Sequence, residues 1–156
     1  MTPRIDSASR LISASPKTVY RAFSEPGAME RWLPPGNMTG KMLHFDFREG
    51  GSYRMRLTYA EPQQGRGKTS KDSDEVEVRL TKLEDGRRIE QEINFESEDA
   101  ALSGVMRMTW TFQAEDEGTL VTIRAANVPT GIRPEDHDVG LNSSLENLAR
   151  FVETEG

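Results

Sequence analysis

The sequence predicts a single α+β domain over residues 1–156, in which a curved antiparallel sheet of six to seven strands wraps around a long C-terminal helix. From Thr39 to Ala125, apolar residues alternate with polar ones, as in strands that bury one face. From Pro134 to about Val152, apolar residues recur at helical spacing instead. A sheet with one apolar face needs a cover, and we expect this helix to provide it.

The first 36 residues predict one strand followed by two short helices. Residues 4–13 alternate in polarity as a strand does. Ser15 can cap a helix that begins at Pro16, because serine accepts backbone N–H bonds and proline is tolerated in a first helical turn. We expect the Glu-Pro-Gly at residues 25–27 to end this helix and the Pro-Pro-Gly at residues 34–36 to end the second.

Three turn sequences divide the period-two region into hairpins: Glu-Gly-Gly at 49–51, Glu-Asp-Gly at 84–86 and residues 115–118. We expect a long polar loop over residues 61–73 and a second loop over residues 96–103.

Strict alternation in the first of these strands places Leu43, Phe45 and Phe47 on the buried face. On this interpretation His44 and Asp46 point to solvent, so they are surface residues and not a general-base pair.

Composition and motifs exclude several classes of function. The chain has no cysteine, which excludes disulfides, thiolate metal sites and a cysteine nucleophile and favours a cytoplasmic location. No stretch reaches the roughly 20 apolar residues that span a bilayer, so we expect no membrane insertion. A formal charge of −6 opposes binding to nucleic acid. Residues 64–69 imitate the end of a phosphate-binding loop, but Pro62 replaces its first glycine, so we expect no cofactor.

Local sequence resembles the START-like, or SRPBCC, superfamily. Ile-Ser-Ala-Ser-Pro-Lys-Thr-Val-Tyr-Arg-Ala-Phe at residues 12–23, Arg31-Trp32, and Phe-Asp-Phe-Arg-Glu-Gly-Gly-Ser-Tyr at residues 45–53 are similar to the branch named for the activator of the ninety-kilodalton heat-shock-chaperone ATPase. Residues 140–148 agree more loosely, with Leu141 where the family commonly has tryptophan. The resemblance implies a helix-grip fold, shared by lipid carriers, hormone receptors, cyclases and co-chaperone domains.

The leading functional hypothesis is non-catalytic binding of a small apolar or aromatic molecule in a cavity between the sheet and the C-terminal helix. His137, Gly140 and Ser144 follow one another along that helix at i, i+3 and i+7. A helical glycine costs roughly 1 kcal/mol relative to alanine, which indicates either close packing against a strand or a cavity. The predicted ligand-binding residues are Trp32, Tyr53, Met55, Gln91, Met106, Met108, Trp110, His137, Gly140, Leu141 and Ser144. For Gln91, a bond to a tyrosine hydroxyl is the alternative to a bond to ligand.

Two other classes remain open. In the first, the chain is a protein-interaction domain whose partner is a chaperone, with contacts on the outer sheet face at Arg54, Arg56, Arg79 and Arg107. In the second, it is a cyclase or hydrolase using Tyr53, Tyr59, His137 or Gln91, although no catalytic constellation joins these residues. We interpret the acidic residues at 135–138 as stabilised by the positive end of the helix dipole and not as metal ligands. A metal site on a helix needs a second donor one turn after His137, and none is present there.

Overall fold

The computed structural model describes residues 4–34, 38–59, 73–95 and 104–154. The elements, in chain order, are β1 (Ile5–Ile12), α1 (Pro16–Ser24), α2 (Pro26–Trp32), β2 (Met38–Phe45), β3 (Ser52–Tyr59), β4 (Ser73–Glu84), β5 (Arg88–Phe95), β6 (Gly104–Glu115), β7 (Gly118–Ala126) and α3 (Pro134–Thr154). The loops predicted at residues 61–73 and 96–103 lie outside the described residues, apart from Ser73.

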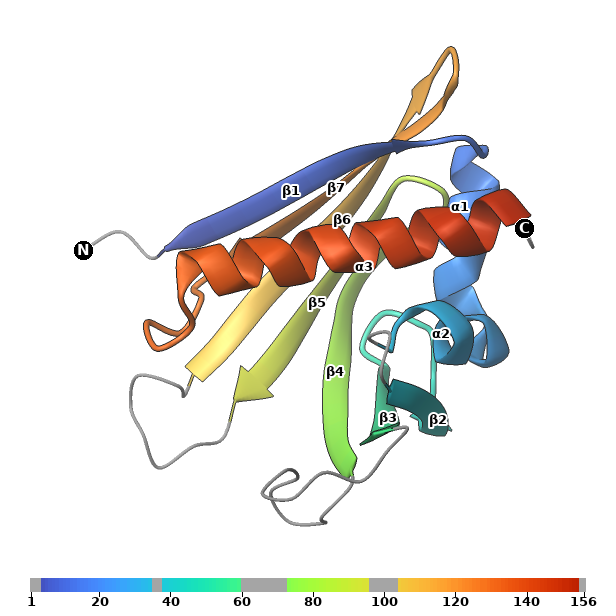
Figure 1. Cartoon of the computed structure of the whole chain (residues 1–156). Coiled ribbons are helices and arrows are strands. Elements are labelled where there is room, and N and C mark those ends of the chain that lie inside the picture. The colour runs from blue at the N-terminus through green and yellow to red at the C-terminus, as the bar shows by residue number, and fades with distance from the viewer. Residues whose placement is uncertain (1–3, 35–37, 60–72, 96–103, 155–156) are drawn as a thin grey trace.

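Within the described residues, seven strands form one antiparallel sheet in the order β1-β7-β6-β5-β4-β3-β2. Figure 1 shows α3 lying across one face of the curved sheet, with α1 and α2 beside its C-terminal end. The predicted α+β helix-grip architecture is therefore confirmed. No described helix is both long and apolar enough to cross a membrane.

The predicted start of α1 is confirmed in detail. Ser15 has extended backbone angles, and its Oγ accepts a hydrogen bond of 3.2 Å from the Thr18 N–H. Pro16 takes the first helical position, where its missing N–H leaves no intrahelical bond unmade. The predicted turn at residues 84–86 is also present, and its glycine, Gly86, has a φ of 73° that disfavours side chains.

The alternation predicted for β2 is wrong at one position. The β2–β3 register shifts between Met42 and His44. A β-bulge places one extra residue in one strand, and side chains beyond it change faces. Met42 and Phe45 consequently pack against the core, whereas Leu43 is exposed. His44 is exposed, as predicted.

The helix α3 runs alongside β1 in the same direction. Near its start, His137 contacts Asp6 early in β1. Near its end, Glu153 accepts a hydrogen bond of 2.9 Å from the backbone N–H of Ser13, just after β1. The predicted apolar stripe faces the sheet; its buried members are Leu141, Leu145, Leu148, Ala149 and Val152.

The outer face of the sheet carries cross-strand ion pairs. Arg54 of β3 lies 2.9 Å from Glu77 of β4, and Arg56 lies 3.3 Å from Glu75, each directly opposite its partner in the register. These carboxylates lie on β4, which runs between β3 and β5 in the sheet. Such exposed pairs contribute little to stability, typically below about 1 kcal/mol each.

Candidate functional site

The buried apolar residues of the described chain form two groups. The larger group fills the space around α1, α2 and the C-terminal part of α3. A smaller group contains Met106, Ala125 and Val128, with Ile132 at its edge. Ile93 and Met108 pack against both groups. The two groups meet on the inner face of the sheet, and this region is the candidate ligand site.

One cross-strand row of inward-facing residues runs through this region. Sheet register places Leu80, Gln91, Met108, Ala125 and Asp6 side by side on β4, β5, β6, β7 and β1. We call these five residues the Gln91 row. Most of the surrounding inner face is apolar, so Gln91 and Asp6 are polar exceptions within it. Their separation spans three strand spacings, or about 14 Å.

The buried Gln91 amide, next to Leu80 in the row, hydrogen-bonds the hydroxyl of Tyr53 on β3. Both side chains are buried. Burial raises the pKa of Tyr53, and the hydrogen bond to Gln91 opposes that rise only partly. The neutral phenol is therefore strongly favoured, and Gln91 has the tyrosine partner that the sequence offers as one of two alternatives.

At the other end of the row, three side chains form a polar cluster, which we call the Asp6 cluster. His137 Nδ1 lies 2.7 Å from Asp6 Oδ2, and Arg4 Nη2 lies 3.1 Å from the same oxygen. The side chains of Asp6 and His137 are only 15% and 13% exposed. Arg4 Nε is buried and has no hydrogen-bond acceptor among the described residues.

The sequence analysis places His137 at the site but misses both of its neighbours there, Asp6 in β1 and Arg4 just before β1. A signal for them exists, because the alternation that buries Ile12 and half-buries Ala8 also turns Arg4 and Asp6 to the same side. An aspartate at an inward position of a strand requires a partner, and the covering helix is the element that can supply one.

Several predicted site residues belong to the larger apolar group instead. Trp32 and Trp110 pack edge to face, with ring centroids 5.9 Å apart, and Phe23 contacts both. Met55 is fully buried in the same group. Trp32 donates its Nε1–H to the carbonyl of Ala22 at 2.9 Å, whereas Trp110 Nε1 is buried without an acceptor among the described residues.

Along α3, the remaining predicted residues face different surroundings. Leu141 is buried and belongs to the larger group, and Ser144 is half-buried. Gly140 is exposed, and no described atom lies within 4 Å of the position that a Cβ would take. Close packing against a strand, one of the two explanations predicted for this glycine, is therefore excluded. Met106 and Met108 lie on the inner face, where they were expected.

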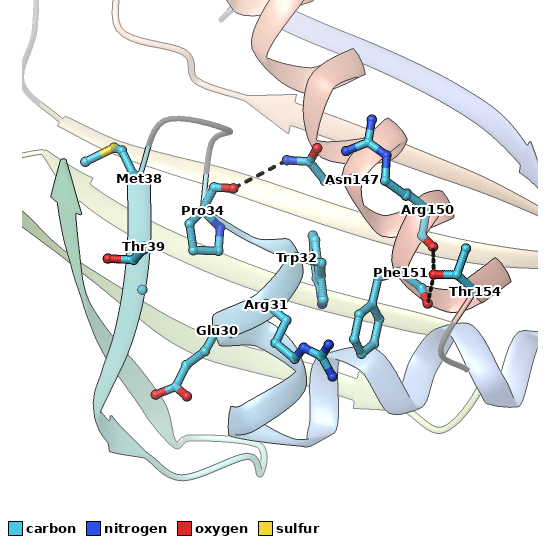
Figure 2. A pocket seen from close by; sticks show the side chains of 11 residues that line it. Glu30, Arg31, Trp32, Pro34, Met38, Thr39, Asn147, Arg150, Phe151 and Thr154 are labelled. Atoms are coloured by element: carbon cyan, nitrogen blue, oxygen red, sulfur yellow. Dashed lines mark hydrogen bonds between the residues drawn. The ribbon is translucent and has the colours of Figure 1, made fainter. Parts of the chain in front are cut away.

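A separate cleft of about 420 Å³ lies between α2, the start of β2 and the C-terminal turns of α3 (Figure 2). Its lining residues are Glu30, Arg31, Trp32, Pro34, Met38, Thr39, Gly40, Asn147, Arg150, Phe151 and Thr154. Of the predicted site residues, only Trp32 borders it. Sequence patterns give no signal for this cleft, because its walls come from three segments that meet only in the folded chain.

The charged groups that line this cleft already have partners. The Arg31 guanidinium lies over the Phe151 ring, 5.7 Å from its centroid, and Arg150 pairs with Glu146 at 2.9 Å. The Glu30 carboxylate accepts a hydrogen bond of 2.6 Å from the backbone N–H of Met42. The Glu30 and Arg31 contacts tie α2 to β2 and α3, which is a structural role for these residues around the cleft.

Comparison with known proteins agrees with this architecture. Among solved structures, a protein from Chromobacterium violaceum is 34% identical, has a TM-score of 0.80 and matches over 96% of each chain. An AHSA1-like protein from Aeromonas hydrophila is 18% identical, with a TM-score of 0.77 over 97% of this chain and 93% of that one. A protein from Arthrobacter aurescens is 17% identical, with a TM-score of 0.78 over 97% and 87% of the two chains.

At 17–18% identity, the Aeromonas and Arthrobacter proteins show a shared fold alone. No curated protein matches the chain. A family model with the description "Activator of Hsp90 ATPase homolog 1-like protein" matches residues 13–153, which is most of the chain. The chain therefore belongs to this family, as the resemblance at residues 12–23 and 45–53 predicts.

Proposed function

We propose that the protein binds a small apolar or aromatic molecule, without catalysis, between the inner sheet face and the N-terminal half of α3. The observation that carries this proposal is the interruption of the apolar core at the Gln91 row, where two buried groups meet and the polar side chains of Gln91 and Asp6 interrupt the apolar surface. Ligand sites are typically apolar surfaces with a few placed polar groups.

The composition of this wall suits an adaptable ligand site. Met106 and Met108 are unbranched and polarizable, so they can adjust to differently shaped apolar molecules. Ala125, between Met108 and Asp6 in the row, has the smallest side chain of the five. The Tyr53–Gln91 pair and the Asp6 cluster add polar groups that can orient a ligand.

A thermal-shift screen against fatty acids, sterols, flavonoids and small aromatics tests the proposal. A ligand at 100 times its dissociation constant adds about 2.7 kcal/mol to the free energy of unfolding, enough to raise the melting temperature clearly. We expect shifts confined to one chemical class. Absence of a shift with every class would contradict the proposal.

A blocking variant locates the binding. Met108→Trp places a larger side chain on the inner face, so it should abolish the ligand-induced shift. Thr109→Trp is the matched control, because the neighbouring residue on the same strand points to the opposite face and should leave the shift intact. Equal shifts in both variants would place the ligand elsewhere.

The family description supports a second candidate, an interaction with a chaperone of the Hsp90 type. The outer sheet face would make the contact, although Arg54, Arg56 and Arg107 each have a carboxylate partner at 2.9–3.5 Å. Stimulation of ATP hydrolysis by a purified Hsp90, lost when Arg54 and Arg79 are both changed to Glu, would favour this candidate. An unchanged hydrolysis rate with the wild-type chain would count against it.

A further inference from the structure

We propose that the ligand of the inner-face site carries an uncharged hydroxyl group, which donates a hydrogen bond to Nε2 of His137. This inference rests on the proposed binding function and specifies the chemical class of the ligand. It is carried by the geometry of the Asp6 cluster.

The hydrogen bond to Asp6 determines how the imidazole is protonated. An ionised carboxylate can only accept hydrogen bonds, so the 2.7 Å contact between Asp6 Oδ2 and His137 Nδ1 requires the hydrogen on Nδ1. In the neutral ring, Nε2 then carries a lone pair and accepts. Among the described residues, Nε2 has no hydrogen-bond partner of its own.

Arg4 and His137 share the carboxylate of Asp6. Arg4 is permanently charged and lies 3.1 Å from the same Asp6 oxygen, so this pair is already neutral as a unit. The side chains of His137 and Asp6 are only 13% and 15% exposed.

The cluster also offers a hydrogen-bond donor. Arg4 Nε is buried without an acceptor among the described residues, and a buried unpaired donor is unfavourable by about 1 to 3 kcal/mol. A hydroxyl group can donate to one atom and accept from another. It therefore suits a cluster that presents an acceptor at His137 and a donor at Arg4 better than a carboxylate or an amine does.

The row explains where the rest of the ligand would lie. From Asp6, the inner face continues over Ala125 and Met108 before it reaches Gln91, about 14 Å away. This length accommodates two aromatic rings end to end. A flat apolar molecule with a hydroxyl at one end matches this arrangement.

Three biphenyl probes of similar shape test the inference by titration calorimetry: biphenyl, 4-methoxybiphenyl and 4-phenylphenol. Only the phenol can donate a hydrogen bond. We expect the wild-type chain to bind 4-phenylphenol roughly tenfold more tightly than the other two, the scale of one hydrogen bond in a site shielded from water. This comparison needs no variant and so does not depend on a mutant folding.

Two variants assign the effect to His137. His137→Phe keeps a ring but removes Nε2, so the phenol should lose its roughly tenfold advantage over biphenyl in this variant. The control is His44→Phe, which changes an exposed histidine on β2 and should preserve the advantage.

The outcomes separate the inference from the function on which it rests. Equal affinity of the wild type for all three probes would overturn the hydroxyl assignment and leave the apolar site standing. An advantage that survives in His137→Phe would overturn the role of His137. Binding of none of the probes would overturn the inference together with the proposed site for aromatic ligands.

Discussion

The hydrogen bond between Tyr53 and Gln91 is a buried polar contact whose contribution can be measured directly. Tyr53→Phe removes the hydroxyl and leaves the Gln91 amide without this partner, so we expect a loss of about 1 to 2 kcal/mol in the free energy of unfolding. Urea unfolding at pH 7 measures it. Tyr20→Phe is the control, because the Tyr20 hydroxyl makes no hydrogen bond to a described residue; equal losses in both variants would show that the Tyr53 bond contributes nothing particular.

Tyr53 also predicts how stability changes in alkali. Burial raises its pKa in the folded chain above the ordinary value of 10.0. The unfolded chain therefore releases this proton first, so the contribution to stability is complete below about pH 10 and is lost as the pH rises towards the folded-state value. Tyr20 acts with the same sign, because burial, Asp85 and Glu49 raise its pKa.

The measurement is the free energy of unfolding of wild type and Tyr53→Phe at pH 8 and pH 11. We expect wild type to lose more stability than the variant between these two values. A larger loss in the variant would contradict the assignment of a raised pKa to Tyr53.

Helix α3 covers the sheet with its buried apolar stripe. The contribution of this stripe to the free energy of unfolding can be tested with two substitutions on opposite sides of the helix. Leu145→Ala empties a fully buried position and should cost about 2 to 5 kcal/mol, the range for leucine truncation in a core. Val139→Ala changes a residue that is 69% exposed and should alter stability by less than about 0.5 kcal/mol. Similar effects, measured by urea unfolding, would mean that α3 is not the cover of the sheet.

The elements could be predicted where a local pattern determines them. The cap at Ser15, the turn at residues 84–86 and the leucine stripe of α3 are all present, because each depends on residues close together in the chain. The exposure of Leu43 could not be predicted, since the bulge depends on how β2 pairs with β3. A single added residue changes the face of every side chain beyond it.

The inward positions of individual residues could be predicted from the sequence, but their contacts could not. His137, Gln91, Met106 and Met108 do lie on or over the inner face, because periodicity identifies which side of an element is buried. Alternation along β1 indicates that Asp6 points inward, but its contact with His137 could not be derived from spacing along the chain, because the two residues are 131 positions apart. The same limit applies to the cleft beside α2, which is built from three separate segments.

The seven methionines of the chain report on its different regions and can locate a bound ligand in the whole molecule. Met106 and Met108 lie on the inner face of the sheet, Met38 lines the cleft beside α2, and Met29 is a buried residue of α2. The most direct test of the central claim is NMR of ¹³C-methyl-methionine protein titrated with a ligand from the thermal-shift screen. Binding between the sheet and α3 predicts saturable shifts of the Met106 and Met108 methyl signals, with the Met38 signal unchanged. Shifts at Met38 with unchanged signals for Met106 and Met108 would contradict the claim and place the ligand in the cleft.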